Sequence, residues 1–359
     1  MSRLVETFFD FVRIDSESGE ERAFLEHLAK RFTEVFDAAC TFDDYGNLVA
    51  RIAGRGSSVA VPVLFGFHGD TVKPGVGIDP FLEDGVIRSR GNTVLGADDK
   101  AGIAEFLGAL RTAKRRPPLE VVVTREEELG VRGARHLDRS LLSASIGFVV
   151  DMDALDTVVI GGPSKMSLDV EITGRAAHAA MEPEKGISAI RAASLAIATL
   201  REGRIDEETT VNVGILHGGE IRNGVPAKAT VQLECRSLSH EKCLEQEATI
   251  RRVFTAAAEA IGARATVETE LSYRAVRVPE NAAVVGLAKR AISSVGLEPR
   301  TRVIGGGTDA SFYNAHGIET VILGVGMCDE HTTDEHIAVS DMERAVAIQR
   351  ALLTALADS

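Results

Sequence analysis

The sequence has few cysteines and no long hydrophobic run. Its 359 residues include four cysteines, Cys40, Cys235, Cys243 and Cys328. None has the CxxC spacing of a zinc-cysteine site, and such scattered thiols fit a reducing compartment better than a disulfide framework. No segment reaches the roughly 18 apolar residues of a membrane span, and residues 1–28 lack the uninterrupted apolar stretch of a signal peptide. We therefore expect a cytoplasmic protein without a membrane partner.

An excess of basic residues is also missing. The chain carries 40 Lys and Arg against 53 Asp and Glu, which leaves a formal net charge of -13. Binding to a phosphate backbone would therefore depend on a local basic patch, and we expect no nucleic-acid partner. Apolar residues make up 45% and charged residues 26%, as in ordinary globular proteins, and the length suggests about two domains.

Strand-length apolar runs alternate with helical segments toward both ends of the chain. The runs span Asn47–Ile52, Val59–Phe67, Leu119–Thr124, Ile146–Val150 and Thr320–Val325. The helical segments span Leu4–Ile14, Ala101–Arg115, Ala282–Val295 and Asp341–Ala357. This alternation predicts an α/β domain in which helices flank a sheet.

The middle of the chain follows a different order. It predicts strand Ser167–Thr173, helix Ser188–Glu202, strands Thr209–Leu216 and Ala227–Arg236, helix Glu241–Ile261 and strand Ala265–Leu271. The order β-α-β-β-α-β is the ferredoxin-like plan. We therefore expect a domain of residues 165–274 inserted into an outer α/β domain that consists of residues 1–164 and 275–359.

Several potential metal ligands and acid/base groups lie near the ends of predicted strands in the outer domain. Directly after strands come His68 with Asp70, the triple glutamate 126–128, and Asp151. Asp98 precedes a helix, and His331 lies in a polar loop. Because ligands of open α/β sheets bind outside the carboxyl ends of the strands, these side chains can converge on one crevice.

Each of these residues also has a structural interpretation. A histidine at a strand end is more often hydrogen-bonded than metal-bound, Asp98 could cap a helix, and His336 competes with His331 as a ligand. As a set, two imidazoles and at least three carboxylates suit Zn²⁺ without a thiolate. A pair of divalent ions needs a bridging carboxylate, and hydrolysis also needs an uncoordinated carboxylate as general base. The adjacent Glu127 and Glu128 could divide the roles of base and ligand.

Seven motifs occur in order over nearly the whole chain. They are His68-Gly69-Asp70-Thr71, Gly96-Ala97-Asp98-Asp99-Lys100-Ala101-Gly102, Glu127-Glu128-Leu129-Gly130, Val150-Asp151, Gly174-Arg175-Ala176-Ala177-His178-Ala179, Gly306-Gly307-Thr308-Asp309 and His331-Thr332-Thr333-Asp334-Glu335. Together they resemble the M20 metallopeptidases, and within them the peptidase T, or tripeptide aminopeptidase, branch. The resemblance implies a zinc-exopeptidase-like catalytic domain with a mixed central sheet, and an inserted lid and dimerisation domain.

The resemblance also implies a metal site with two Zn²⁺ per subunit, which Co²⁺ or Mn²⁺ could replace. One ion would be bound by His68, Asp98 and Asp151. The other would be bound by Asp98, Glu128 and His331, so that Asp98 bridges the two. In the family the peptide bond after the bridging aspartate is often cis, which implies a cis bond between Asp98 and Asp99.

The same resemblance implies roles for five further residues and for one loop. Glu127 would be the general base, and Asp70 would orient the imidazole of His68. His178 would reach the active site of a partner subunit and stabilise an oxyanion, while Asn223 and Arg236 would bind substrate. The loop that contains Gly307 could supply backbone amides near the substrate, or it could be only a tight turn.

Two departures from the peptidase T pattern leave alternatives open. Asp153 competes with Asp151 as a ligand, although the predicted strand ends at Asp151. The extra Glu126 would shift base and ligand to Glu126 and Glu127 if the motif were displaced by one residue. We expect a dimeric zinc aminopeptidase of short peptides; the alternatives are an N-acyl amino-acid deacylase or carboxypeptidase with the same metal site, and an inactive metal- or peptide-binding module.

Overall fold

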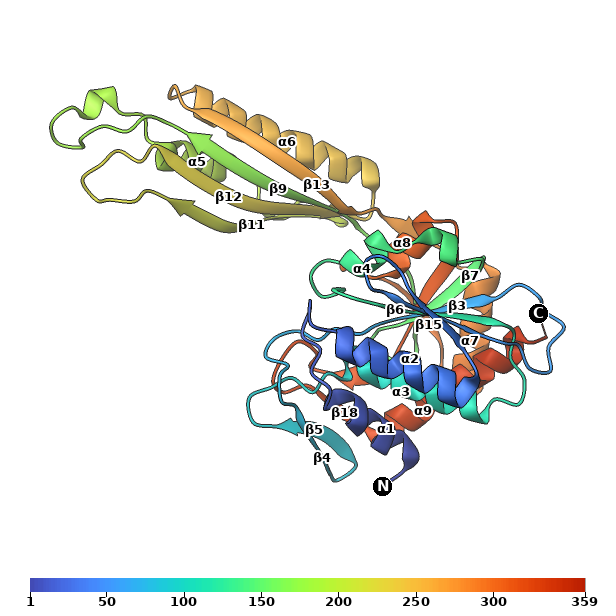
Figure 1. Ribbon diagram of the computed structural model, residues 1–359. Helices are drawn as coiled ribbons and strands as arrows, with labels where there is room; N and C mark the ends of the chain where they lie inside the picture. Colours follow the sequence, from blue (N-terminus) through green and yellow to red (C-terminus); the bar gives the residue numbers. More distant parts are fainter. Residues whose placement is uncertain (359) are drawn as a thin grey trace. The chain divides into compact units, whose positions relative to one another are not determined.

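The computed structural model describes residues 1–358, which form two compact units (Figure 1). The outer unit comprises Met1–Gly161, Arg277–Ile304 and residues 308–358. The inserted unit comprises Gly162–Val276 and Gly305–Gly307. Each unit has its own sheets and its own core, and we describe them separately.

A mixed nine-stranded sheet forms the centre of the outer unit. Its strands lie in the order β1-β2-β6-β3-β7-β16-β8-β14, and β15 pairs with β8. They are β1 (Ala39–Phe42), β2 (Leu48–Ile52), β3 (Val63–His68), β6 (Leu119–Thr124), β7 (Ile146–Val150), β8 (Thr157–Gly162), β14 (Val276–Arg277), β15 (Arg300–Val303) and β16 (Glu319–Leu323). β3 is parallel to β6 and β7, whereas β2 is antiparallel to β6. The sheet confirms the predicted α/β class.

Helices cover this sheet and bury its central strands. They are α1 (Arg3–Val12), α2 (Arg22–Phe36), α3 (Ala97–Thr112), α4 (Arg132–His136), α7 (Ala283–Ser293), α8 (Ala310–Ala315) and α9 (Val339–Leu356), with a short 3₁₀ helix, η1 (Arg139–Leu141). All residues of β3 and β6 are buried, as expected for parallel strands covered on both faces. The rings of Phe65 and Phe67 on β3 lie 4.7 and 5.2 Å from the ring of Phe106 on α3. This packing holds the end of β3 against α3.

A small antiparallel sheet in the outer unit was not predicted. It consists of β4 (Asp79–Glu83), β5 (Val86–Arg90), β17 (Met327–Cys328) and β18 (His336–Ala338), in the order β17-β18-β5-β4. These strands are short, and β4 and β5 carry too few apolar residues to show a strand pattern. The turn between them, Asp84-Gly85, has positive φ at both residues and is the available sequence signal for a hairpin.

The inserted unit has the predicted ferredoxin-like order. Its elements are β9 (Ser164–Thr173), the 3₁₀ helix η2 (Pro183–Lys185), α5 (Ala189–Thr199), β10 (Gly203–Arg204), β11 (Thr209–Gly218), β12 (Lys228–Ser237), α6 (His240–Glu259) and β13 (Arg264–Tyr273). The strands form an antiparallel sheet in the order β10-β11-β12-β9-β13, and α5 and α6 pack on one of its faces (Figure 1). The topology confirms the β-α-β-β-α-β prediction.

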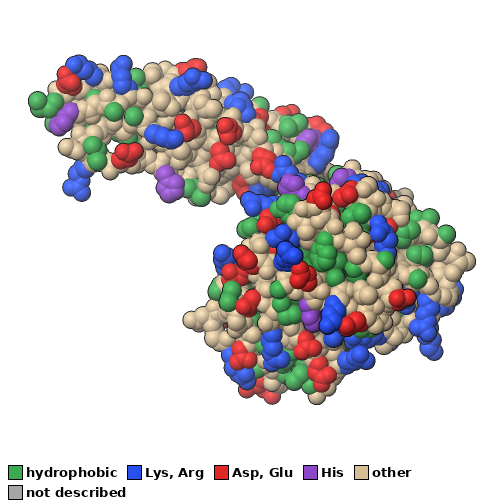
Figure 2. Space-filling model, in the orientation of Figure 1, with side chains coloured by type: hydrophobic (Ala, Val, Ile, Leu, Met, Phe, Trp, Pro, Cys, Tyr) green, Lys and Arg blue, Asp and Glu red, His purple; other side chains and the backbone are tan. Residues whose placement is uncertain are grey.

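Basic and acidic side chains are interspersed on the face drawn in Figure 2, so this face has no large patch of one charge. Within residues 1–358, no helix combines the length and the apolar character needed to cross a bilayer.

All four cysteines are free thiols, including Cys235 and Cys243, whose Sγ atoms lie 3.9 Å apart in the core of the inserted unit.

Glu105 is an unusual group because it is fully buried between α3 and α9. Gln349 Nε2 donates to its Oε2 at 3.5 Å, and its Oε1 has no hydrogen-bond partner among the described residues. Burial, and then the charge of Asp341, raise the pKa of Glu105 well above its ordinary value. The stability that this group contributes is therefore present at acid pH and is lost as the pH rises above the pKa of the unfolded chain.

Glu105→Gln should remove the loss of stability that the buried carboxyl group causes at higher pH. We expect the variant to raise the free energy of unfolding at pH 8 by roughly 1–3 kcal/mol, and to have little effect near pH 4.5. Urea unfolding at both pH values measures this difference. The matched control is Glu343→Gln on the exposed side of α9, which should change stability by less than about 0.5 kcal/mol. An equal effect of Glu105→Gln at the two pH values would contradict the prediction.

Candidate metal centre

His68, Asp98 and Glu128 form a candidate metal site in the outer unit. One ligand atom from each lies within 4.8 Å of the others. His68 is the last residue of β3, Asp98 lies at the start of α3, and Glu128 follows β6. Imidazole nitrogens and carboxylate oxygens are ligands that Zn²⁺ and similar divalent ions accept, so this donor set fits such a metal.

Asp98 lies between the two histidines that sequence reasoning selected. Its Oδ1 is 2.8 Å from Nε2 of His68, and its Oδ2 is 3.2 Å from Nε2 of His331. His331 Nε2 is also 2.9 Å from Oε1 of Glu128. A carboxylate whose two oxygens face two different imidazoles has the geometry that a bridging ligand requires. The peptide bond between Asp98 and Asp99 is cis, as the family resemblance implied.

Asp151 completes this group from the end of β7. Its Oδ1 lies 3.7 Å from Nε2 of His68. The competing Asp153 makes no such contact; its carbonyl accepts a hydrogen bond from Gly326, and its buried Oδ1 has no partner among residues 1–358. The structure thus places Asp151, rather than Asp153, beside the histidine.

His336, the alternative to His331, is turned toward other groups. Its Nδ1 lies 3.0 Å from the carbonyl oxygen of Asp334 and 3.5 Å from Oδ2 of Asp329. It belongs to β18, where its neighbour across the ladder is Arg88. His331 is instead held at φ 64° in the loop before β18 and faces Asp98.

Electrostatic crowding is severe around Asp98. Burial raises the pKa of Asp151 to about 7, and burial with the charge of Asp151 raises that of Glu127 well above its ordinary value. Hydrogen bonds to Asp98 and Glu128 raise the pKa of His331 to about 11. Several buried carboxylates so close together repel one another, and a divalent cation would remove that repulsion. The electrostatics therefore also fit a metal.

Asp70 organises this site through its backbone and its side chain. Its carbonyl oxygen lies 3.1 Å and its Oδ1 lies 3.3 Å from Nδ1 of His68, which leaves Nε2 of that ring facing Asp98. The same carboxylate accepts backbone N–H groups of Glu127 at 3.0 Å and Glu128 at 3.1 Å, and the hydroxyl of Ser18 at 2.7 Å. Burial acts to raise the pKa of Asp70, but these hydrogen bonds and the charge of His68 outweigh it and lower the pKa. Asp70 thus contacts both the ring of His68 and the loop with the two glutamates.

The three consecutive glutamates point to different surroundings. Oε2 of Glu126 accepts a 2.6 Å hydrogen bond from the hydroxyl of Tyr45 and lies 3.6 Å from Arg132. Glu128 faces His331, and Glu127 is close enough to Asp151 for that charge to raise its pKa. The geometry therefore favours the assignment in which Glu127 and Glu128, not Glu126 and Glu127, belong to the site.

Sequence reasoning gave no role to Glu335, which connects two parts of the site. Its carboxylate accepts backbone N–H groups of Leu95 at 2.7 Å, Gly96 at 2.8 Å and Asp98 at 3.0 Å. It therefore joins the loop of His331 to the start of α3. Local sequence carries no signal for this contact, because the partners are about 240 residues apart.

In the inserted unit, the structure brings His178 and Asn223 together on adjacent loops. His178 forms a β-bridge with Gly224, and the N–H of Ala179 donates to the carbonyl of Asn223 at 3.0 Å. Nδ1 of His178 accepts the N–H groups of Ala180 and Met181, at 3.2 and 3.1 Å. A neutral ring with Nδ1 as acceptor carries its proton on Nε2, so this exposed histidine presents a hydrogen-bond donor.

Arg236 and Gly307 lie elsewhere in the same unit. Arg236 is close to the C-terminal end of β12, whereas Asn223 precedes the start of that strand. Between Lys228 and Arg236, β12 spans roughly 26 Å at about 3.3 Å per residue. Gly307 packs on the ring of Tyr273, which lies 2.3 Å from the place of a Cβ, so no side chain fits there. The four predicted residues thus occupy opposite ends of the sheet.

Comparison with known proteins identifies relatives over nearly the whole chain. Residues 64–355 match Peptidase family M20/M25/M40. Aminopeptidase PepT from Bacillus cereus has a similar structure, with 36% identity, a TM-score of 0.90 and coverage of 99% of this chain and 98% of that one. A tripeptidase from Staphylococcus aureus gives 34% identity, a TM-score of 0.93 and the same coverage. The uncharacterized protein YqjE of Bacillus subtilis is 36% identical over 98% of this chain and 97% of its own.

Asp70→Asn should weaken metal binding without removing a ligand. The amide nitrogen would face an N–H donor, which would weaken the hold of this side chain on the ring of His68 and on the glutamate loop. The backbone carbonyl of Asp70 would keep its contact with Nδ1 of His68. We expect the affinity for Zn²⁺ to fall by roughly 10- to 100-fold, measured by competition with a chromogenic chelator. Glu126→Gln, in the same loop but facing Tyr45, is the control and should bind as tightly as the wild type. Unchanged affinity in Asp70→Asn, with circular dichroism showing a folded protein, would refute the assigned role.

Proposed function

The chain belongs to Peptidase family M20/M25/M40, and from this premise we propose that it is a binuclear-zinc exopeptidase that removes the N-terminal residue of short peptides, tripeptides in particular. The observation that carries the proposal is Asp98, whose two oxygens face His68 and His331 beside two further acidic residues. Similarity along the full chain to an aminopeptidase and to a tripeptidase supports this substrate class.

Five side chains would hold the metal ions. His68, Asp98 and Asp151 would bind one Zn²⁺, and Asp98, Glu128 and His331 the other, with Co²⁺ or Mn²⁺ as possible substitutes. When bound, the ions polarise the scissile carbonyl and lower the pKa of a water molecule. The contacts that Asp70 and Glu335 make with the surrounding loops would keep these ligands in place.

Glu127 would act as the general base. Its carboxyl group is not engaged by Asp70, which binds only its backbone N–H. Burial and the charge of Asp151 raise its pKa above the ordinary value of a glutamate, and a carboxylate with a raised pKa is a stronger base. Glu127 would accept the proton of the attacking water and then donate it to the leaving amine.

A homodimer through the inserted unit would explain the separation of its two groups of predicted residues. The loops with His178 and Asn223 lie beyond the Lys228 end of β12, and Arg236 is roughly 26 Å from Lys228 along that strand. Both groups therefore cannot contact one short peptide within a single chain. Met181 and Ile221, which flank the His178 and Asn223 loops, are 76% and 68% exposed, as suits an interface. We propose that His178 and Asn223 serve the active site of the partner subunit, where His178 stabilises the oxyanion, in a cytoplasmic enzyme.

A panel of peptides tests the proposed reaction against its alternatives. Zinc-loaded protein is offered a tripeptide, a dipeptide, an N-acetyl tripeptide and an N-acetyl amino acid, each with and without chelator. We expect chelator-sensitive hydrolysis of the free tripeptide only, because an aminopeptidase must recognise the free ammonium group. Hydrolysis of only the acylated compounds would favour a deacylase. Release of the C-terminal residue would favour a carboxypeptidase, and no hydrolysis of any compound would favour a binding module.

Glu127→Ala tests the general base. We expect kcat for the tripeptide to fall by roughly 10²- to 10⁴-fold, while bound zinc, measured by elemental analysis, stays at the wild-type level. Glu126→Gln, one residue away, should keep most of its activity. Full turnover in a zinc-loaded Glu127→Ala protein would eliminate the proposed base.

Mixing two inactive variants tests the role of His178 across the dimer. Glu127→Ala and His178→Ala subunits, unfolded and refolded together, should form heterodimers in which one active site has both residues intact. We expect activity to return to about a quarter of the wild-type value, since half of the dimers are mixed and each has one complete site. Activity that stays at the level of the separate variants would indicate that His178 acts within its own chain or not at all.

A further inference from the structure

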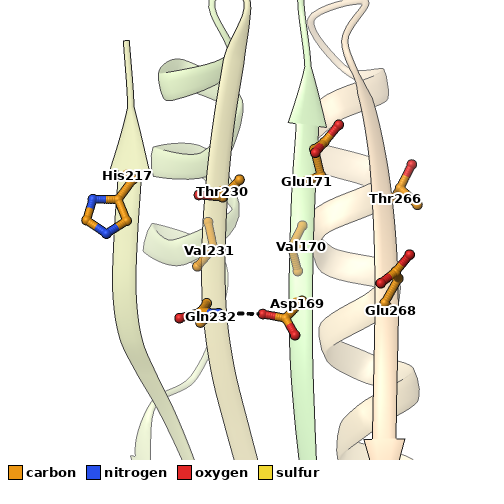
Figure 3. A pocket seen from close by; sticks show the side chains of 9 residues that line it. All are labelled: Asp169, Val170, Glu171, His217, Thr230, Val231, Gln232, Thr266 and Glu268. Atoms are coloured by element: carbon orange, nitrogen blue, oxygen red, sulfur yellow. Dashed lines mark hydrogen bonds between the residues drawn. The ribbon is translucent and has the colours of Figure 1, made fainter. Parts of the chain in front are cut away.

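The sheet of the inserted unit has one open face, opposite α5 and α6. Figure 3 shows polar side chains of β9, β12 and β13 on this face, with the helices behind the strands. Asp169 accepts a 2.7 Å hydrogen bond from Gln232 and has Glu268 as its neighbour on the other side. These residues line a depression of about 450 Å³ in which the charged groups are mainly acidic.

The charge reverses at one end of the same face. Side chains at alternate positions of a strand share a face, so Lys165 points to the same side as Asp169. Its Cα partners across the sheet are Arg236 on β12 and Tyr273 on β13. Two cations that lie directly opposite each other on neighbouring strands repel, and a sheet gains no stability from that pair alone.

Glu234 joins the two cations. It accepts hydrogen bonds from Nε and Nη2 of Arg236 at 2.8 and 3.2 Å, and its Oε2 lies 3.1 Å from Nζ of Lys165. Burial acts to raise the pKa of Glu234, but Arg236 and Lys165 outweigh it and keep the carboxylate ionised. One negative charge between two positive charges leaves the group with a net charge of +1.

The group also keeps hydrogen-bond donors. Nη1 of Arg236 donates to the carbonyl of Gly305 at 3.2 Å, so each terminal nitrogen has used one hydrogen and retains a second. The ammonium of Lys165 has three hydrogens and a single acidic partner among the described residues. Both side chains are partly exposed, Lys165 to 20% and Arg236 to 29%, so a ligand can reach them.

We propose that Lys165 is a specificity-determining residue that binds, together with Arg236, the C-terminal carboxylate of the peptide substrate. The inference rests on the proposed function, since it extends the substrate-binding role assigned to Arg236. Glu234 already has a bidentate partner in Arg236, so neutralising Glu234 does not require the lysine. A surplus cation beside a guanidinium with spare donors matches one incoming carboxylate in charge and in hydrogen bonding.

Lys165→Gln tests the inference, because glutamine can still donate to Glu234 but has no charge. With zinc-loaded enzyme, we expect KM for a tripeptide with a free carboxylate to rise roughly five- to thirtyfold, with kcat within about twofold of the wild type. KM for the same tripeptide as its C-terminal amide should not change. The control is Lys228→Gln at the other end of β12, where Lys228 pairs with Glu171 at 2.6 Å; it should leave both KM values unaltered.

Other outcomes separate this inference from the proposed function. Equal KM increases for acid and amide, or no increase for either, would overturn the role of Lys165 while leaving the peptidase intact. If the wild type hydrolyses neither compound, calorimetric titration of both into wild type and Lys165→Gln decides the matter. If the wild type binds the tripeptide with a free carboxylate more tightly than its amide, and Lys165→Gln loses this preference, carboxylate binding is supported although the proposed reaction has failed. If the wild type shows no such preference, the proposed role of Lys165 is overturned.

Discussion

The crowding of carboxylates around Asp98 is the constraint on which the site depends. Asp98 lies within 3.2 Å of two imidazoles, and the neighbouring Asp151 and Glu127 are protonated more readily than ordinary acids because they are buried close together. Such a cluster is costly unless positive charge enters it. The surrounding structure is arranged to hold the cluster in place, chiefly through backbone N–H groups.

Two carboxylates that are not proposed to bind metal provide most of that support. Asp70 accepts the N–H groups of the glutamate loop, and Glu335 accepts those at the start of α3. Both therefore satisfy backbone donors that would otherwise be buried without partners. The end of β3, which carries His68, is held by the rings of Phe65 and Phe67, which pack on α3. Ligand geometry is thus decided by the packing of the sheet and by hydrogen bonds to loops.

The inserted unit distributes its polar groups between two ends of one sheet. The loops with His178 and Asn223 lie beyond one end, and the cluster of Lys165, Glu234 and Arg236 lies at the other. The ten residues of β12 between them span roughly 30 Å. A peptide in contact with both ends would therefore have to lie between two chains, which links the proposed dimer directly to the proposed catalysis.

The order of elements and the kinds of side chain at the strand ends could be predicted from sequence alone, because hydrophobic periodicity and turn residues are local properties. The α/β class and the ferredoxin-like insertion followed from those patterns. The choice between neighbours such as Glu126 and Glu128, or Asp151 and Asp153, depended on tertiary structure, since residues one or two positions apart are equally close in sequence and only the backbone path decides where they point. Glu126 and His331 both adopt positive φ, which redirects the chain beside each. The contacts of Glu335 connect segments about 240 residues apart, and the pairing of β5 with β18 connects segments about 250 residues apart. Such pairings arise only when the whole chain has folded.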